Sequence, residues 1–319
     1  MRSKRRTLLS TLLLAALAAG AVAFAWFGVE KRDEAAERKK VADEKLYAFS
    51  PAKVKTVTVE AKGATTRLAR ARTGDVDGWR VEAPVQADAE RAAVDALVDK
   101  VAELRRKAAV SAVPDDAALA RYGLARPRAK VALALEDGRV ETLALGDENP
   151  FDGTVFVRTT GGAVELVPGD VRWSVERGTF DLRDKTVLRF DREQVATLRF
   201  RMGATTFEAT RDGTPTRLPG VLWTLSSLRA TAFADESGRS IAAHGLDHPA
   251  REVALLGKDG KELDRLLVSP ERGGKTFAKA ASSPCIVELD PGSLASLPRS
   301  AGDLKETPPP NPQAKTAPK

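Results

Sequence analysis

An internal repeat constrains the fold of this chain more than any other feature of its sequence. Nine identities fall within 23 positions when the chain is compared with itself at an offset of 122. The identical residues of the first copy are Gly123, Leu124, Pro127, Val131, Ala132, Leu133, Asp137, Gly138 and Leu145. Their counterparts in the second copy are Gly245, Leu246, Pro249, Val253, Ala254, Leu255, Asp259, Gly260 and Leu267. A second match, Gly63-Ala64-Thr65-Thr66 against Gly203-Ala204-Thr205-Thr206, lies at an offset of 140 and in the same order. The sequence therefore predicts two copies of one module.

Each copy has the pattern of an α+β module with a largely antiparallel sheet and one or two packed helices. Two alternating strands come first, and each pair turns at the Gly-Ala-Thr-Thr segment. An amphipathic helix follows at 88–107 in the first copy, where we expect Asp88 to be the N-cap, and a shorter one follows in the second. Further short strands are predicted at 155–157, 164–167, 276–278 and 286–289.

The matched glycines and prolines predict how these elements end. A helix end is predicted at Tyr122-Gly123-Leu124 and at His244-Gly245-Leu246, each of which is followed by a proline. Glycine suits the C-cap of a helix, and proline cannot continue a helix. Asp137-Gly138 and Asp259-Gly260 predict tight hairpins. We also expect the paired acids Asp115-Asp116 to cap a short helix rather than to act in catalysis.

The N-terminus predicts a membrane anchor. Thr7 to Val29 run 23 residues without a charge, which is roughly 34 Å of helix. Four basic residues precede this run, so the positive-inside rule places the N-terminus in the cytoplasm and the body outside the inner membrane. A cleaved signal peptide is the alternative, since Ala21-Val22-Ala23 and Ala23-Phe24-Ala25 fit its cleavage pattern. We favour the uncleaved anchor because signal-peptide apolar cores usually run only about 7–15 residues.

Five parts follow along the chain. The basic tip and transmembrane anchor (or signal peptide) take residues 1–29, and a charged helical stalk takes 30–45. The first α+β module covers 46–190, and the second, shorter module covers 191–304. Residues 305–319 form a Pro-rich tail that we expect to be disordered.

The charge distribution argues against nucleic-acid binding. The net charge is +7, but most of the excess lies in the basic tip and in the tail. The body between them is nearly neutral, with interspersed signs, whereas phosphate binding needs a concentrated basic face.

The candidates for metal and nucleotide binding are few. His244 and His248 are the chain's two histidines, and imidazoles four residues apart on a helix can share a metal ion. Gly245 and Pro249 predict that the helix ends here, so we expect packing and surface roles instead. Ser269 to Thr276 lacks the first glycine of a phosphate-binding loop, and its alignment with the first copy predicts that it enters a strand. We therefore expect no metal, nucleotide or other cofactor.

Other reactive side chains suggest structural roles. Cys285 is the single cysteine, and its place before a predicted strand favours a small buried hydrophobe. Trp79, Trp173 and Trp223 lie in apolar periodic segments, so we expect core anchors, with a ligand-stacking platform as the alternative. Residues 183–185, Arg-Asp-Lys, form a charged cluster before the module junction. This cluster is either a solvated turn or a polar contact that fixes the angle between the modules.

The order of these motifs resembles a known bacterial family, the domain of unknown function 4340. The resemblance covers roughly residues 54 to 300, and is carried by Trp79 with Pro84, the helix at 88–107, Tyr122-Gly123-Leu124 with Pro127, Asp137-Gly138, Leu143-x-Leu145-Gly146, Phe156-Val157 and Phe180-x-Leu182-Arg183-Asp184-Lys185. It implies a membrane-anchored protein associated with ABC-type transport systems of the gliding-motility type, and it supplies no catalytic residues. The second copy departs from the pattern, because His244 replaces the tyrosine and no Leu-Arg-Asp-Lys ends it.

Three functional hypotheses follow. The first is a non-enzymatic, single-pass accessory or scaffold protein of an ABC-type transport or envelope complex, with the cytoplasmic membrane and a permease or envelope protein as partners. The second is a binding module for an envelope polymer or small ligand in the groove between the modules. The third is a metal-dependent hydrolase centred on His244 and His248.

Overall fold

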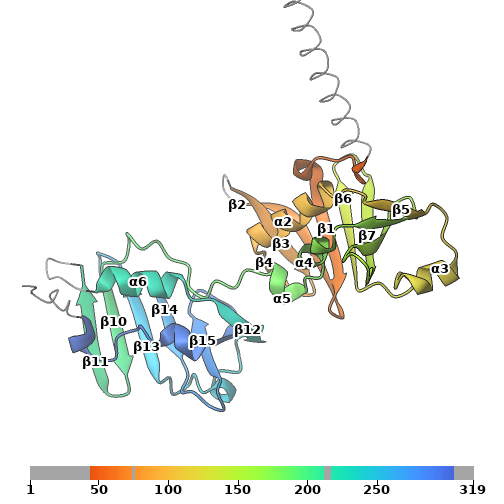
Figure 1. Ribbon diagram of the computed structural model, residues 1–319. Helices are drawn as coiled ribbons and strands as arrows, with labels where there is room; N and C mark the ends of the chain where they lie inside the picture. The colour runs from red at the N-terminus through yellow and green to blue at the C-terminus, as the bar shows by residue number, and fades with distance from the viewer. Residues whose placement is uncertain (1–43, 74–75, 212–216, 305–319) are drawn as a thin grey trace, which may run out of the picture. The chain divides into compact units, whose positions relative to one another are not determined.

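The described residues fold into two compact units, which divide between Asp184 and Lys185. A computed structural model describes residues 44–73, 76–211 and 217–304, and shows each unit as a sheet with a few helices (Figure 1). The predicted anchor at 1–29, the stalk at 30–45 apart from its last two residues, and the tail at 305–319 lie outside the described residues. Within the described part of the chain, no helix is both long and apolar enough to cross a membrane.

One antiparallel sheet of nine strands organises the first unit, in the order β4-β3-β2-β1-β6-β7-β8-β9-β5. Its strands are β1 (Val54–Ala61), β2 (Ala64–Thr73), β3 (Val76–Ala83), β4 (Ala87–Asp88), β5 (Ala108–Ser111), β6 (Ala129–Leu135), β7 (Val140–Glu148), β8 (Val155–Thr159) and β9 (Val164–Val167). Its helices are the 3-10 helices η1 (Pro51–Lys53) and η2 (Gly169–Val171) and the α-helices α2 (Arg91–Ala102), α3 (Asp116–Arg121), α4 (Arg172–Val175) and α5 (Thr179–Leu182).

The second unit has an antiparallel sheet of seven strands, in the order β11-β10-β13-β14-β15-β16-β12. Its strands are β10 (Thr197–Met202), β11 (Thr205–Thr210), β12 (Ala230–Asp235), β13 (Arg251–Leu256), β14 (Glu262–Val268), β15 (Thr276–Ala280) and β16 (Ile286–Leu289). Its helices are α6 (Leu218–Ser226) and the 3-10 helices η3 (Ala242–His244), η4 (Pro291–Leu294) and η5 (Ala301–Leu304).

The two sheets have the same topology. The order β2-β1-β6-β7-β8-β9-β5 in the first unit corresponds strand for strand to β11-β10-β13-β14-β15-β16-β12 in the second. β3 and β4 extend the first sheet beyond β2 and have no counterpart among the described strands of the second unit. The prediction of two largely antiparallel sheet modules is therefore confirmed.

The first hairpin of each unit shows that the Gly-Ala-Thr-Thr match does not align equivalent residues. The turn between β1 and β2 is Lys62-Gly63, whereas that between β10 and β11 is Gly203-Ala204, so equivalent residues lie 141 apart rather than 140. A shift of one residue exchanges the two faces of a strand. Accordingly, Thr66 is buried in the first sheet but Thr206 is exposed in the second. The Gly-Ala-Thr-Thr identity aligns glycines that occupy different turn positions.

A β-bulge shows that one of the nine identities, Leu145 with Leu267, does not pair equivalent residues. The ladder between β13 and β14 skips Leu263, while the corresponding ladder between β6 and β7 is unbroken. After this extra residue, the strand equivalent of Leu145 is Val268 rather than Leu267. Leu145 and Val268 both belong to the core clusters, and Leu267 lies on the opposite face of its sheet. Because of the inserted residue, the identical residue Leu267 is not the structural equivalent of Leu145.

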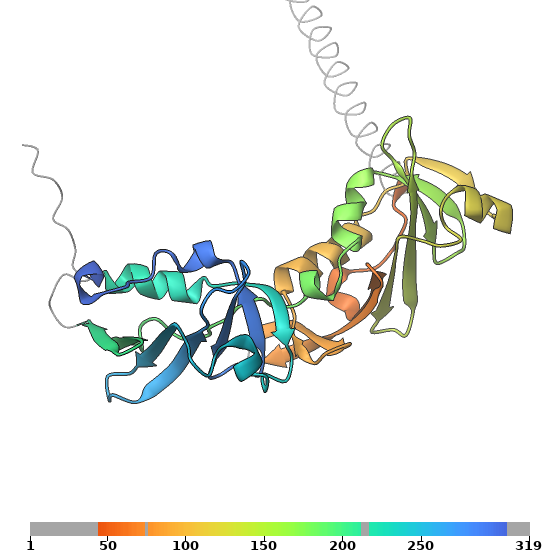
Figure 2. The same ribbon diagram turned by 90° about the horizontal axis from the view of Figure 1, so that it is seen from below.

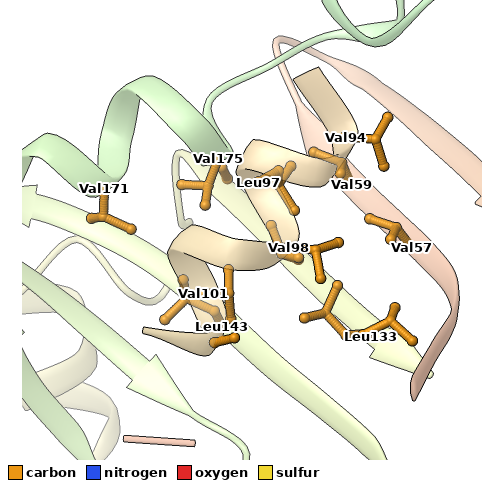
Figure 3. Close-up of a cluster of buried hydrophobic side chains, with 14 of the residues drawn as sticks. Val57, Val59, Val94, Leu97, Val98, Val101, Leu133, Leu143, Val171 and Val175 are labelled. Atoms are coloured by element: carbon orange, nitrogen blue, oxygen red, sulfur yellow. The ribbon is translucent and has the colours of Figure 1, made fainter. Parts of the chain in front are cut away.

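Helix α2 covers one face of the first sheet. Its apolar residues recur at three- and four-residue spacing, and Figure 3 shows Val94, Leu97, Val98 and Val101 pointing toward side chains of β1, β6 and β7. Helices α4 and α5 contact α2, as Figure 2 also shows. The predicted cap at Asp88 is wrong, because Asp88 is taken into β4 and α2 begins at Arg91. The second sheet is covered in the same way by the apolar face of α6.

The predicted local signals before β6 and β13 are confirmed. Asp115 caps α3 by accepting a hydrogen bond from the backbone N–H of Ala118 at 2.7 Å. Gly123 and Gly245 end α3 and η3 with φ angles of +70° and +67°. Only glycine adopts this left-handed conformation at low cost, which explains why it stands at this point in both copies.

Candidate functional site

His244 occupies a packing position. Its ring contacts Phe277 edge-on, with centroids 4.7 Å apart, where the first unit stacks Tyr122 on Phe156 at 4.5 Å. Its Nδ1 lies 2.8 Å from the carbonyl oxygen of Ser240. His248 has 94% of its side chain exposed. Over the described ranges, no group of three or more His, Cys, Asp or Glu residues could hold a metal ion.

The segment that approximates a phosphate-binding loop is a hairpin. Arg272 and Lys275 form a β-bridge around Gly273-Gly274, and both glycines have positive φ. The chain then enters β15, as the repeat predicts. A phosphate loop needs the N-terminus of a helix after its glycines, and this segment does not provide one.

Cys285 is buried immediately before β16, and its side chain belongs to the second core. Its Sγ lies 3.4 Å from Oε2 of Glu236. These surroundings match the packing role that its sequence position predicts.

Trp79 is the core anchor that its pattern predicts. It is 5% exposed, and its indole Nε1–H donates to Oδ1 of Asp95 on α2 at 2.8 Å. The guanidinium of Arg70 lies 4.5 Å from the ring centroid. A buried indole therefore has both a hydrogen-bond partner and a cation over its face.

The core prediction is wrong for the other two tryptophans. Trp173 on α4 is 74% exposed and Trp223 on α6 is 63% exposed. Both helices are amphipathic, and each tryptophan occupies the outward face while the neighbouring residues Val175 and Leu222 are buried. Periodicity over a four-residue helix is too short to fix which side faces the core, and so the sequence misassigned Trp173.

Residues 183–185 carry the chain from the first sheet to the second. Arg183 bridges to Ala89, and the backbone N–H of Asp184 donates to the carbonyl oxygen of Asp88 at 3.0 Å. The carbonyl oxygen of Lys185 accepts from the backbone N–H of Ala230 at 2.8 Å. Arg183 is 6% exposed, which excludes a freely solvated turn for this residue.

A hollow of about 370 Å³ lies on the face of the first sheet opposite α2. Its floor includes the small side chains of Ala132 and Ala144, whose neighbours along β6 and β7 point to the other face and enter the core. Its rim carries Thr58, Glu60, Lys130, Thr142, Arg158 and Thr160. We call this surface the β1–β8 hollow.

The polar groups of the β1–β8 hollow are partly engaged with one another. Lys130 Nζ lies 3.4 Å from Oε2 of Glu60. The hydroxyl of Thr160 donates to Oε2 of Glu141 at 2.9 Å and accepts from the backbone N–H of Thr142 at 2.7 Å. Arg158 donates through Nε to the carbonyl oxygen of Gly162 at 3.3 Å. Within the described residues, Arg158 forms no ion pair with an acidic side chain.

The same face of the second sheet is built from larger, paired side chains. Strand pairing makes Arg265, Leu267 and Lys279 the equivalents of Thr142, Ala144 and Arg158. Glu252 stands at the position of Lys130 and forms ion pairs with Arg201 and with Arg265, whose Nη1 lies 3.1 Å from Oε1 of Glu252. The small side chains on the floor of the hollow are therefore specific to the first copy and do not follow from the shared topology.

The comparisons with known proteins add one finding. Residues 79–220 match the family model described as a domain of unknown function (DUF4340). The resemblance to this family is therefore confirmed. The DUF4340 match begins in β3 and ends in α6, so it takes in β6, β7 and β8 but not β1. No curated protein and no solved structure matches the chain.

Sequence reasoning missed the β1–β8 hollow. The available signal was a difference between the copies: Ala144 and Thr142 stand where the second copy has leucine and arginine. That signal was hidden by the bulge at Leu263, because alignment without it places these residues on the wrong face. The DUF4340 match itself points to no site, since the family is described only by its unknown function.

Proposed function

We propose that this protein is a non-enzymatic, membrane-anchored accessory or scaffold protein outside the cytoplasm. It spans the inner membrane once, with its N-terminus in the cytoplasm, and works in an ABC-type transport or envelope complex. The apolar run after a basic tip supports the location. The association is part of the proposal and follows from what the resemblance to the family implies. The partner is a permease subunit or an envelope protein.

Exposed tryptophans carry the scaffold part of this proposal. Each unit presents one of them on the outer face of a helix, Trp173 on α4 and Trp223 on α6. Tryptophan is enriched at the energetic centres of protein interfaces. Burial of either ring against a partner would be favourable, because it would remove a large apolar surface from water.

Photo-crosslinking in intact cells tests the proposal. A photoreactive residue at position 173 or 223 of the full chain is expected to give a discrete adduct with a permease or envelope protein. The same residue at position 113 is the matched control, because Val113 is 90% exposed on a loop. The Trp173→Ala and Trp223→Ala variants are expected to lose co-purification with the crosslinked partner. Recovery of the monomer alone, or the same adducts from position 113, would contradict the scaffold function.

A second candidate function is favoured by the β1–β8 hollow. A concave surface of about 370 Å³ with convergent polar groups lies within the usual size of small-molecule sites. The alternative is therefore an extracytoplasmic binding module for a small ligand or for part of an envelope polymer. Ligand binding measured on the purified protein distinguishes this function from scaffolding alone.

A further inference from the structure

We propose that the β1–β8 hollow binds the anionic group, a carboxylate or a phosphate, of a small polar ligand. This inference rests on the second proposed function, ligand binding by the first unit, and names the chemical class of the ligand. It does not depend on the membrane anchor or on the scaffold partner.

The charges on the rim select for an anion. Arg158 and Lys130 contribute two cations to the hollow, and Glu60 contributes one carboxylate that lies 3.4 Å from Lys130. Arg158 uses Nε for the carbonyl oxygen of Gly162, which leaves the Nη groups for a ligand. A guanidinium binds carboxylate and phosphate oxygens through charge-assisted hydrogen bonds.

The hydroxyl groups select for a polar ligand. Thr58, Thr142 and Thr160 lie around the hollow, and the hydroxyl of Thr160 is already held by Glu141. The backbone at Thr142 is fixed from the other side, because the hydroxyl of Tyr47 donates to its carbonyl oxygen at 2.6 Å. Burial raises the pKa of Tyr47, with a further contribution from Glu141, so this donor stays protonated. The hydroxyls of Thr58 and Thr142 are therefore presented by strands β1 and β7, and that of Thr160 by the turn after β8.

The second copy builds the same face of its sheet from different side chains. There Glu252 sits between Arg201 and Arg265 with 11% of its side chain exposed, and Leu267 takes the place of Ala144. Glu252 is therefore neutralised by two arginines whose side chains are 57% and 44% exposed. In the first sheet, the corresponding space is open and Arg158 lacks an acidic partner among the described residues.

Calorimetric titration of the full chain in detergent micelles tests the proposal. Inorganic phosphate and D-gluconate are the two anionic probes, and D-glucose is the uncharged control. At least one anion is expected to bind saturably in the millimolar range or tighter, and glucose is expected not to bind. Binding of phosphate alone identifies a phosphoryl ligand, whereas binding of gluconate alone identifies a hydroxylated carboxylate.

Three variants assign the binding to this surface. Arg158→Gln is expected to weaken binding by about tenfold or more, because it removes the charge of an exposed side chain. Ala144→Leu introduces the residue of the second copy and is expected to abolish binding by filling the hollow. Lys279→Gln removes the equivalent cation of the second sheet and is expected to leave binding unchanged.

The proposal is overturned if neither anion binds at about 10 mM, if glucose binds as well as the anions, or if Arg158→Gln binds like the wild type. Arg158→Gln alone decides the case if Ala144→Leu fails to fold, since Arg158 lies at the surface. Crosslinking from positions 173 and 223 is expected to be the same in Arg158→Gln as in the wild type. Loss of the ligand site is therefore distinguishable from loss of the scaffold function.

Discussion

Single side chains differ sharply in their energetic importance, and the tryptophans provide a direct comparison. Trp79 fills the core between β3 and α2 and also donates to Asp95 at 2.8 Å. We expect Trp79→Phe to lower the free energy of unfolding by about 1–3 kcal/mol, because the hydrogen bond to Asp95 and part of the packing are lost. Trp173→Phe is the matched control, with an expected change within about 0.5 kcal/mol. Urea denaturation followed by circular dichroism measures both, and equal losses would refute this contrast.

Asp235, the last residue of β12, makes a pH-dependent contribution to the stability of the fold through its bonds to the loop that follows. Its carboxylate accepts hydrogen bonds from the backbone N–H groups of Ser237 and Ser240 at 2.8 and 2.9 Å. These bonds, led by the one from Ser240, hold the pKa of Asp235 below its ordinary value. A lowered folded-state pKa stabilises the fold above the ordinary pKa of about 3.9, and this stabilisation is lost as the pH falls through the folded-state value.

The Asp235→Asn variant isolates this effect. We expect it to be less stable than the wild type at pH 6–7, and we expect the difference to shrink below about pH 4. Thermal unfolding between pH 7 and pH 2.5 measures the difference directly. A gap that is constant across this range would show that the charge of Asp235 plays no part.

Individual elements show which features the sequence determines and which it does not. The Asp-Gly hairpins, the glycine helix ends and the strand that follows Cys285 are predicted by local chemistry, and all are present. Asp88 looked like an N-cap, but it pairs in β4 because β3 offers it a strand partner. Local propensity cannot reveal a partner that depends on the rest of the sheet.

The bulge at Leu263 explains why the repeat was predictable as a whole but not residue by residue. Its insertion leaves the turn at Gly260 in register with Gly138 but shifts every later residue of β14 to the other face. The core tolerates the shift because alternate positions carry Leu266 and Val268 toward it. Identity at Leu267 was therefore coincidental, and the hollow in the first copy became visible only when the pairing was known.

At the scale of the molecule, the described residues use one topology twice, with a separate core for each copy. The core of the first unit lies between its sheet and α2, and the core of the second lies between its sheet and α6; the two clusters share no described residue. Hydrophobic stabilisation depends on the contacts that a side chain makes. A cavity in one core should therefore loosen its own sheet first.

Amide hydrogen exchange tests this expectation, because it measures the protection of each strand separately. Leu97→Ala, which truncates a fully buried residue of α2, is expected to cost about 2–5 kcal/mol and to speed amide exchange in β1, β6 and β7. Leu222→Ala on α6 is the reciprocal variant and is expected to speed exchange in β10, β13 and β14. Each variant is expected to leave protection in the other sheet within about twofold of the wild type, because local opening is governed by local packing. Equal deprotection of both sheets by either substitution would mean that the two copies unfold as one cooperative structure.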